Sequence, residues 1–393
     1  MSRRGIDPVI FSCVLGLMAF GIVMIYSTSH ILSLDRYGDQ YHFVKRHITW
    51  AAIGVVSMLL VARANIQRFR SLAFPVFVLS ATGLLMVFIP EIGREAGGAR
   101  RWITLGSMSI QPAEFAKFGL VFFLAHFLSI KSERLKDLKY GFLPSVMFTS
   151  LLIVLVLAQP DLGTAILIAA VAGMMLFLAG ARWQHLAGCA FLTSPVLYWM
   201  VFAVPWRKQR VLAFLDPFHS AQTTGYQLVQ SLVGMARGGF LGTGLGEGKQ
   251  KLFYLPEAHT DFIYAVVGEE LGLIGGLTVA AAFAVILYRG LSVASDCQDS
   301  FDSLLAAGVT LLITLQGLIN MSVASGLIPT TGVPLPLVSL GGSSLVMSLT
   351  AFGVLLSIAS GRGAGKATRK NSDDAKSKSG QWLRFAWSSG GGR

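Results

Sequence analysis

The sequence predicts an all-α polytopic membrane protein, and three observations lead to this fold class. Hydrophobic residues make up 53% of the 393 residues and charged residues only 13%, whereas soluble domains carry about 25% charge. The apolar residues come in blocks of roughly 18–25, the length that crosses about 30 Å of hydrocarbon. No small-residue cleavage pattern follows the first block, so it is expected to remain as a span.

About ten apolar blocks are expected to cross the membrane as one helical bundle, and an even number places both termini on one side. Basic residues cluster in the loops of that side, at 63–70 and 131–139, which makes it cytoplasmic by the positive-inside tendency. Residues 1–361 are expected to form a single transmembrane domain, and 362–393 a disordered basic cytoplasmic tail. The expected spans are 9–28, 48–62, 71–89, 112–129, 142–158, 162–180, 185–204, 262–288, 303–325 and 343–360.

The formal net charge of +12 does not indicate a nucleic-acid partner, because many of the basic residues lie in short loops and in the tail. That pattern orients membrane proteins and attracts the headgroups of anionic membrane lipids. Cys13, Cys189 and Cys297 are scattered and lack metal-ligand spacing. The cysteines therefore predict neither a disulfide framework nor a metal site.

Two irregular segments are expected at the outer end of the bundle. The large extracytoplasmic loop 205–261, between the seventh and eighth spans, is too long for a simple connector, and its apolar stretches predict short interfacial helices. The segment 326–344 holds prolines and glycines at membrane depth. Non-helical backbone survives there only when it is buried in protein or lines a wet cavity. We therefore expect a cavity in the outer half of the bundle.

Three ionisable residues, Glu257, His259 and Asp261, immediately precede the eighth span. Such groups are costly to desolvate at a membrane boundary and usually serve chemistry. A carboxyl group in a partly desolvated pocket accepts a proton near neutral pH when its pKa is raised, so Asp261 is the candidate catalytic base. The alternative for Asp261 is a helix N-cap. His259 either supports it or binds substrate, and Glu257 can equally be a structural partner for Arg or Lys.

Candidate phosphate ligands lie on the same side. Arg101 can bind phosphate oxygens bidentately, or it can simply snorkel at the interface. Lys117 stands one turn inside the fourth span and three residues from Glu114, so the two either pair with one another or belong to a substrate-binding network. Arg210 belongs to a basic run that is either solvated or attracts anions. Asp161 is a cap of the sixth span in one interpretation and a site residue in the other.

With these motifs together, the chain resembles the SEDS family (shape, elongation, division, sporulation), which includes FtsW and RodA. Ala258 and Gly268 favour the division branch of the family. Two residues depart from the family pattern: Thr331 stands where division members often carry a basic residue, and Leu340 replaces the usual aromatic residue. The matching strings are GGARRWI (97–103), QPAEFAK (111–117), QPDLGTA (159–165), FLDPF (214–218), GYQLVQS (225–231), GGFLGTGLG (238–246), LPEAHTDFIYAVVGEELG (255–272), GLIPTTGVPLPLVS (326–339) and GGSS (341–344).

This resemblance implies a peptidoglycan glycosyltransferase in the bacterial cytoplasmic membrane, acting at the division septum. It implies lipid II as the substrate, inverting transfer that forms a β-1,4 bond, release of undecaprenyl diphosphate, and Asp261 as the essential acidic residue. Gln230 and Ser343 lie in the matching strings and are further substrate-binding candidates. The implied partners are a class B penicillin-binding protein, which is a transpeptidase, and other divisome proteins.

Two alternatives to a polymerase remain. A lipid II flippase would also show broken helices, intramembrane charges and a central cavity, and a non-catalytic divisome scaffold would need none of the charged residues. No cofactor is required by the pattern. A divalent cation, Mg or Mn, can assist a pyrophosphate leaving group, although no ligand cluster in the sequence demands one.

Overall fold

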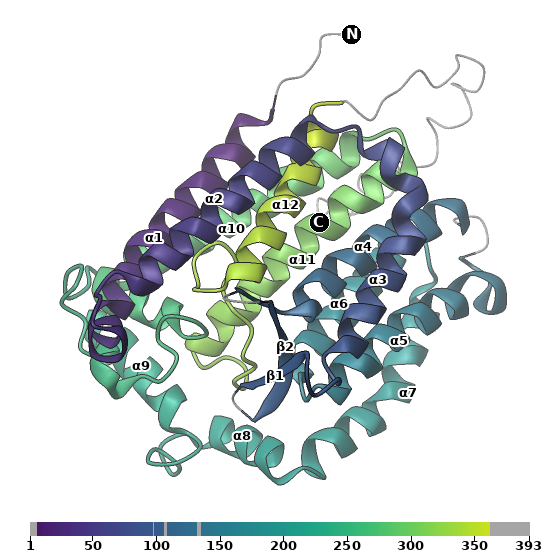
Figure 1. Ribbon diagram of the computed structural model, residues 1–393. Coiled ribbons are helices and arrows are strands. Elements are labelled where there is room, and N and C mark those ends of the chain that lie inside the picture. Colours follow the sequence, from purple (N-terminus) through teal and green to yellow (C-terminus); the bar gives the residue numbers. More distant parts are fainter. Residues whose placement is uncertain (1–5, 97, 106–107, 132–134, 362–393) are drawn as a thin grey trace, which may run out of the picture.

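The protein is described by a computed structural model that covers residues 6–96, 98–105, 108–131 and 135–361. Its helices run side by side as one bundle, and α1 (Pro8–Tyr37) begins at the same end at which α12 (Gly342–Ala359) finishes (Figure 1). That arrangement agrees with an even number of spans. The predicted tail after residue 361 lies outside the described residues.

The predicted membrane spans are confirmed. Among the described residues, nine helical segments are long and apolar enough to cross a bilayer, and α6, with 17 residues, is a shorter apolar helix at the position of the tenth. Both α1 and α10 extend further than the sequence predicts. Besides α1 and α12, the spanning helices are α2 (His42–Arg63), η1 with α3 (Ile66–Leu72, Ala73–Met86), α4 (Pro112–Lys131), η3 with α5 (Leu138–Phe142, Leu143–Ala158), α6 (Leu162–Leu178), α7 (Trp183–Phe202), α10 (Ile263–Asp296) and α11 (Ser300–Ala324).

The long loop between α7 and α10 folds into short helices, as predicted. These are α8 (Pro205–Leu215), α9 (Tyr226–Gly238) and the single turn η4 (Gln250–Tyr254). In Figure 1, α8 and α9 lie at the end of the bundle opposite to the start of α1. They cover the end at which the candidate site residues gather.

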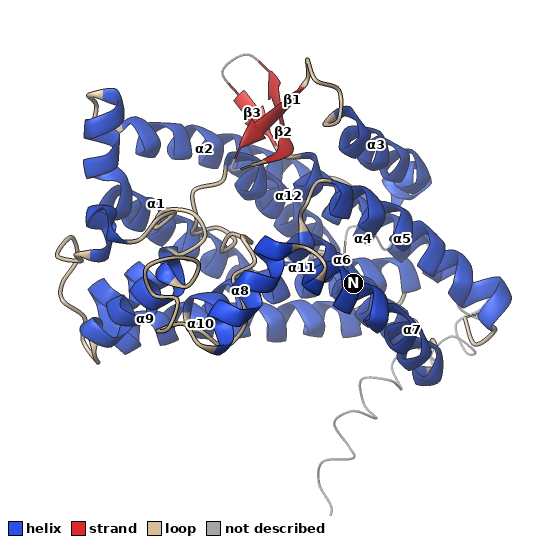
Figure 2. Cartoon of the chain, turned by 90° about the horizontal axis from the view of Figure 1, so that it is seen from below, coloured by secondary structure: helices blue, strands red, loops and turns tan. Residues whose placement is uncertain are grey.

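A three-stranded antiparallel sheet, which the sequence analysis did not predict, lies at this same end between α3 and α4. It consists of β1 (Gly93–Ala96), β2 (Ala99–Leu105) and β3 (Met108–Ile110), drawn in red in Figure 2. The fold is thus helical with one small sheet rather than purely α. The register between β1 and β2 shifts at this point: Arg94 pairs with Trp102 and Glu95 with Arg100, which leaves Arg101 as the extra residue of a β-bulge.

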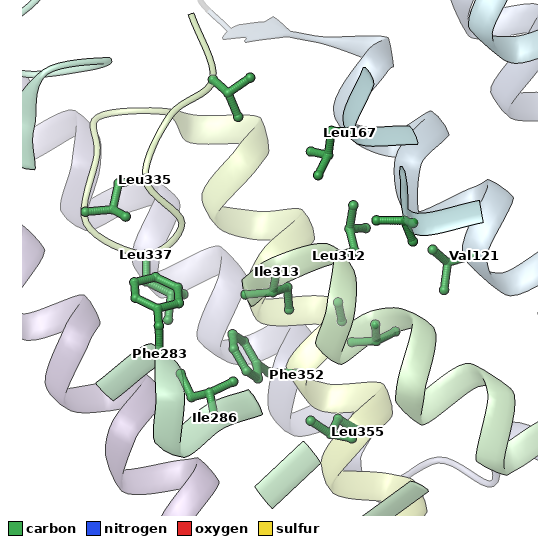
Figure 3. Close-up of a cluster of buried hydrophobic side chains, with 14 of the residues drawn as sticks. Val121, Leu167, Phe283, Ile286, Leu312, Ile313, Leu335, Leu337, Phe352 and Leu355 are labelled. Carbon is green, nitrogen blue, oxygen red and sulfur yellow. The ribbon is translucent and has the colours of Figure 1, made fainter. Parts of the chain in front are cut away.

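The irregular segment before α12 is buried in the protein, as non-helical backbone at membrane depth requires. Residues 328–335 carry no regular secondary structure. Leu335 and Leu337 point into a cluster of apolar side chains that includes Phe283 of α10 and Ile313 of α11 (Figure 3). This packing fixes the segment 328–341 against the centre of the bundle.

The long helix α10 is broken at Gly272, where φ is 67° and ψ is −162°. This backbone region is open almost only to glycine. A Cβ at this position would also lie 2.5 Å from the carbonyl oxygen of Phe240. The break lets the glycine-rich strap 239–249 pack directly on the backbone of α10, where Thr243 N and Gly244 N donate to the carbonyls of Glu269 and Glu270 at 2.9 and 3.0 Å.

The two adjacent glutamates of α10 are fully buried and hold the end of this strap. Glu269 accepts hydrogen bonds from the backbone N–H groups of Lys249 and Gln250, at 2.9 and 3.1 Å. Glu270 accepts from Lys251 Nζ at 2.7 Å and from Ser27 Oγ. Glu270 therefore has the basic partner that a carboxylate at membrane depth needs.

Candidate active site

Asp261 lies where the long outer loop meets α10. The helix begins at Ile263 with Phe262 in the N-cap position, so Asp261 is not the helix cap, and that alternative from the sequence analysis is wrong. The backbone around it is held from three sides: Asn320 Nδ2 donates to Asp261 O at 2.8 Å, Ser339 Oγ to Thr260 O at 2.6 Å, and Leu340 N to His259 O at 3.0 Å.

The charges around Asp261 tune its acidity. Burial raises the pKa of this carboxyl to about 7, the neighbouring carboxylates of Glu257 and Asp161 raise it as well, and the guanidinium groups of Arg210 and Arg101 act in the opposite direction. A carboxylate with such a pKa is suited to accept a proton near neutral pH. Four of the predicted site residues, from separate parts of the chain, are therefore within electrostatic reach of Asp261.

Asp161 caps α6 beside the site. Its carboxylate accepts hydrogen bonds from Thr164 N at 3.1 Å and from Thr164 Oγ1 at 2.9 Å, which confirms that it is a helix cap. The first turn of α6 packs closely on the segment before α12, because a Cβ on Gly163 would lie 2.6 Å from Thr331 O. A Cβ on Gly332 would lie 3.6 Å from Asp261 Oδ2. The turn at 331–332 thus lies against both α6 and Asp261.

Arg101 reaches from β2 to the turn between α5 and α6. Its Nε donates to Gln159 O at 3.0 Å and its Nη2 donates to Pro160 O. Arg100 instead pairs with β1, with its Nε 3.7 Å from Glu95 Oε2. Only Arg101 of the arginine pair therefore lies on the side of Asp261, and its guanidinium is anchored in advance of any ligand.

Lys117 is buried, with a residue exposure of 2%. Its ammonium group donates to Glu114 Oε1 at 2.9 Å and to Gln316 Oε1 at 2.7 Å, so the predicted pairing with Glu114 is present. Gln316 in turn donates to Pro334 O at 3.0 Å. Lysine has three N–H donors, and these contacts use two of them. Lys117 therefore supports the segment before α12 through Gln316.

Arg210 belongs to α8 and is exposed. Its guanidinium carbon lies 5.1 Å from the centre of the Trp206 ring. The protein around its guanidinium group still desolvates it in part, which lowers its pKa; the charge of Arg101 lowers the pKa further, whereas Asp261 raises it. Arg210 and Arg101 therefore approach Asp261 together, from the long loop and from the sheet.

His259 and Glu257 flank the site on the loop. The ring centre of His259 lies 5.4 Å from that of Phe43, and burial lowers its pKa, with Glu257 raising it and Arg36 lowering it. Glu257 has a positive φ of 57° and accepts a hydrogen bond from Thr260 Oγ1 at 2.8 Å. No Arg or Lys forms an ion pair with Glu257 in the part of the chain that the structure describes.

No hydrogen bond or ion pair between described residues joins the remaining two candidates to Asp261. Gln230 is half-buried on α9. Ser343, in the first turn of α12, accepts a hydrogen bond from Gln111 N at 3.3 Å. Their substrate-binding roles stay predictions.

Comparison with known proteins decides the family. The family described as cell cycle protein, comprising FtsW, RodA and SpoVE, matches residues 8–363. The chain belongs to this family. A probable peptidoglycan glycosyltransferase FtsW from Geobacter metallireducens (strain ATCC 53774 / DSM 7210 / GS-15) is 43% identical over 352 residues, 90% of this chain and 94% of that protein.

Solved structures of the FtsW, RodA and SpoVE family share the fold. One is a chain of a peptidoglycan synthase complex that coordinates polymerization and crosslinking, with a TM-score of 0.76 and 26% identity over 92% of this chain and 99% of that chain. Another is the rod shape determining protein RodA of Thermus thermophilus, with a TM-score of 0.65 and 26% identity over 91% and 97% of the two chains. The resemblance found in the sequence is confirmed.

In this FtsW-like chain, Gln316 and Asn320 of α11 are site residues that the sequence analysis missed. Both are buried and bond to the segment before α12, Gln316 to Pro334 O at 3.0 Å and Asn320 to Val333 O at 2.8 Å. The sequence did contain a signal for them: the two amide side chains lie four residues apart in an otherwise apolar span. Polar groups at membrane depth usually need a partner.

The divalent cation raised as a hypothesis has no ready ligand set in this FtsW-like chain. Among the described residues, no group of three or more His, Cys, Asp or Glu side chains is arranged to hold a metal ion. The carboxylates nearest Asp261 are already engaged, Asp161 with Thr164 and Glu257 with Thr260.

Proposed function

We propose that this chain is a peptidoglycan glycosyltransferase that polymerises lipid II during septal cell-wall synthesis. The observation that carries the proposal is the carboxyl group of Asp261, whose pKa is about 7 and which lies within reach of the guanidinium groups of Arg101 and Arg210. A proton acceptor beside two cations is what transfer of a sugar from a diphosphate requires. The curated relatives named peptidoglycan glycosyltransferase FtsW support the same reaction.

The proposed reaction is a single displacement. The 4-hydroxyl of the acceptor sugar attacks C1 of the donor sugar, and Asp261 removes the hydroxyl proton as the new bond forms. The bond from C1 to the pyrophosphate breaks, and undecaprenyl diphosphate leaves with its electron pair. One displacement inverts the α-linked donor into a β-1,4 product. Holding both sugars in line supplies much of the rate.

The cations serve the leaving group in this mechanism. Arg101 is anchored at Gln159 O and Pro160 O, so its remaining N–H groups point from a fixed position. Arg210 approaches from α8, and Lys117 has one donor left after its bonds to Glu114 and Gln316. Such preorganised donors stabilise negative charge that grows on the diphosphate in the transition state.

Access for lipid-linked substrates is proposed beside α7. No residue of α7 is buried within the described part of the protein, and Phe191, Leu192 and Trp199 are among its most exposed side chains. A helix with so little packing leaves room for a polyprenyl chain to approach the site from the bilayer.

The setting of the enzyme is also proposed. Both termini face the cytoplasm, because the loops at the end where α1 begins carry Arg63, Arg68, Lys136, Lys139 and Arg182. The proposed partner is a class B penicillin-binding protein, supported by the structural likeness to a chain of a peptidoglycan synthase complex. Other divisome proteins are further proposed partners.

The decisive experiment measures glycan synthesis from purified lipid II in detergent, with and without the transpeptidase, for the wild type and Asp261→Asn. The wild type is expected to lengthen glycan, and the variant to lose at least 100-fold in rate, a typical contribution of a general base. A flippase would move labelled lipid II across liposomes without lengthening glycan. A scaffold would tolerate neutralisation of Asp261, and near-normal synthesis by the variant would contradict the proposed role.

A further inference from the structure

An open cavity lies at the other end of the bundle, where α4 ends and where η3 and α7 begin. Its volume is about 480 Å³, and it is lined by Lys136, Asp137, Leu138, Arg182 and His185. It is formed by two loops that the catalytic mechanism does not use. Both loops are on the side of the bundle where α1 begins, away from Asp261 (Figure 1).

The polar groups of this cavity are set up for an anion. Lys136 and Arg182 are exposed cations and outnumber the one carboxylate of the lining, Asp137, whose Oδ1 accepts a hydrogen bond from Lys139 N at 2.9 Å. His185 Nδ1 is buried and has no hydrogen-bond partner among the described residues.

The N-terminus of α7 also favours the binding of an anion in this cavity. The first backbone hydrogen bond of the helix runs from His185 N to Arg182 O at 3.0 Å, so the N–H groups of Trp183 and Gln184 precede the helical ladder. Unpaired N–H groups at a helix N-terminus attract anions, and the helix dipole acts in the same direction.

The rim of the cavity lies at the level of lipid headgroups. Trp183 and Tyr140 are exposed to 66% and 57%, and Leu138 to 53%. Indole and phenol rings gather where hydrocarbon meets water, so the cavity opens at the membrane interface. A soluble anion gains nothing from these apolar neighbours, whereas a lipid can lay its glycerol and acyl chains against them.

We propose that this cavity binds the phosphate group of one anionic phospholipid from the leaflet at this end of the bundle. Arg182 and Lys136 contact the phosphate oxygens, and the acyl chains run along Leu138 and the exposed face of α7. Basic cavities between membrane helices on the cytoplasmic side typically hold such headgroups. The bound lipid holds the first turn of α7 in place, since this helix buries none of its own residues in the described protein.

The test is native mass spectrometry of the full chain in detergent, titrated with dioleoyl phosphatidylglycerol or dioleoyl phosphatidylcholine. The wild type is expected to retain one phosphatidylglycerol at least tenfold more tightly than phosphatidylcholine. Lys136→Gln/Arg182→Gln is expected to weaken phosphatidylglycerol binding about 30-fold, from about 1 kcal/mol for each cation near an anionic lipid. Lys136→Arg/Arg182→Lys keeps the charge and should keep binding.

The matched control is Arg63→Gln/Arg68→Gln, which removes the same charge from the same end of the bundle outside the cavity. This control should bind phosphatidylglycerol like the wild type, and all variants should melt at the wild-type temperature. If the cavity variant and the control variant bound phosphatidylglycerol equally well, the proposed lipid site would be contradicted. A further arm adds millimolar inorganic phosphate: displacement of the lipid at that concentration would identify a site for a soluble anion and overturn the lipid assignment.

Discussion

The side-chain amide of Asn320 donates to the backbone carbonyls of Asp261 and Val333, at 2.8 Å each. One residue of α11 therefore fixes the residue that we assign as the base and the irregular segment that packs beside it. Asn320 has an exposure of 1%, so water cannot replace these bonds. The position of the Asp261 carboxylate depends on the centre of the bundle rather than on the loop that carries it.

Asn320→Ala is expected to lower kcat for glycan synthesis about 10- to 100-fold, because the carbonyls of Asp261 and Val333 lose the donor that fixes their positions, and a small misplacement of a catalytic group costs up to about 100-fold in rate. The measurement is the initial rate at saturating lipid II. Thr310→Val is the control, since the Thr310 hydroxyl bonds only to Ala306 O of its own helix. Similar losses in the two variants would indicate general damage to α11 and would contradict a positioning role for Asn320.

The pH dependence of catalysis should follow the ionisation of Asp261. The base must be deprotonated, so kcat/KM is expected to rise with pH and to level off above about 7. Glu257→Gln removes a negative charge that raises this pKa and should move the rise to lower pH, whereas Arg210→Gln should move it to higher pH, each by up to about one unit. Shifts in the same direction for both variants would exclude Asp261 as the titrating group.

The ionisation of Asp261 should also make the stability of the fold depend on pH. The folded pKa of Asp261, about 7, lies above the value of 3.8 expected when the group is exposed. The native state therefore binds the proton more tightly than the unfolded state, and stability is lost as pH rises through about 7. Asp261→Asn has no such ionisation, so its melting temperature at pH 8 should equal or exceed that of the wild type. A large drop would mean that this carboxylate stabilises the fold.

Lys117 and Glu114 form a buried ion pair, so removing one charge leaves the other without its partner. Lys117→Met alone should cost about 3–5 kcal/mol of unfolding free energy, because it leaves Glu114 charged and unpaired. Glu114→Gln/Lys117→Met should recover most of that loss, as measured by thermal unfolding in detergent. If Lys117 also binds the diphosphate, the double variant regains stability but keeps a raised KM for lipid II. A wild-type KM in a stable double variant would remove Lys117 from substrate binding.

The sequence predicted the parts of this protein that depend on local composition. Apolar blocks located the membrane spans, and the charges before α10 pointed to Asp261. The partners of Asn320 lie 59 and 13 residues away, so they depend on the path of the irregular segment, which periodicity does not encode. The sheet was missed, although Gly97-Gly98 before the alternating β2 sequence is a hairpin signal.

The short helix α6 has a consequence for the site beside it. Its 17 residues rise about 25 Å, less than the roughly 30 Å of an average hydrocarbon core. Its first turn is surrounded by protein rather than lipid, because Asp161, Thr164 and Ala165 are all buried. A full-length span would extend past this point, so the shortness of α6 is what lets Asp161 and the turn 331–332 that packs on it lie inside the bundle beside Asp261.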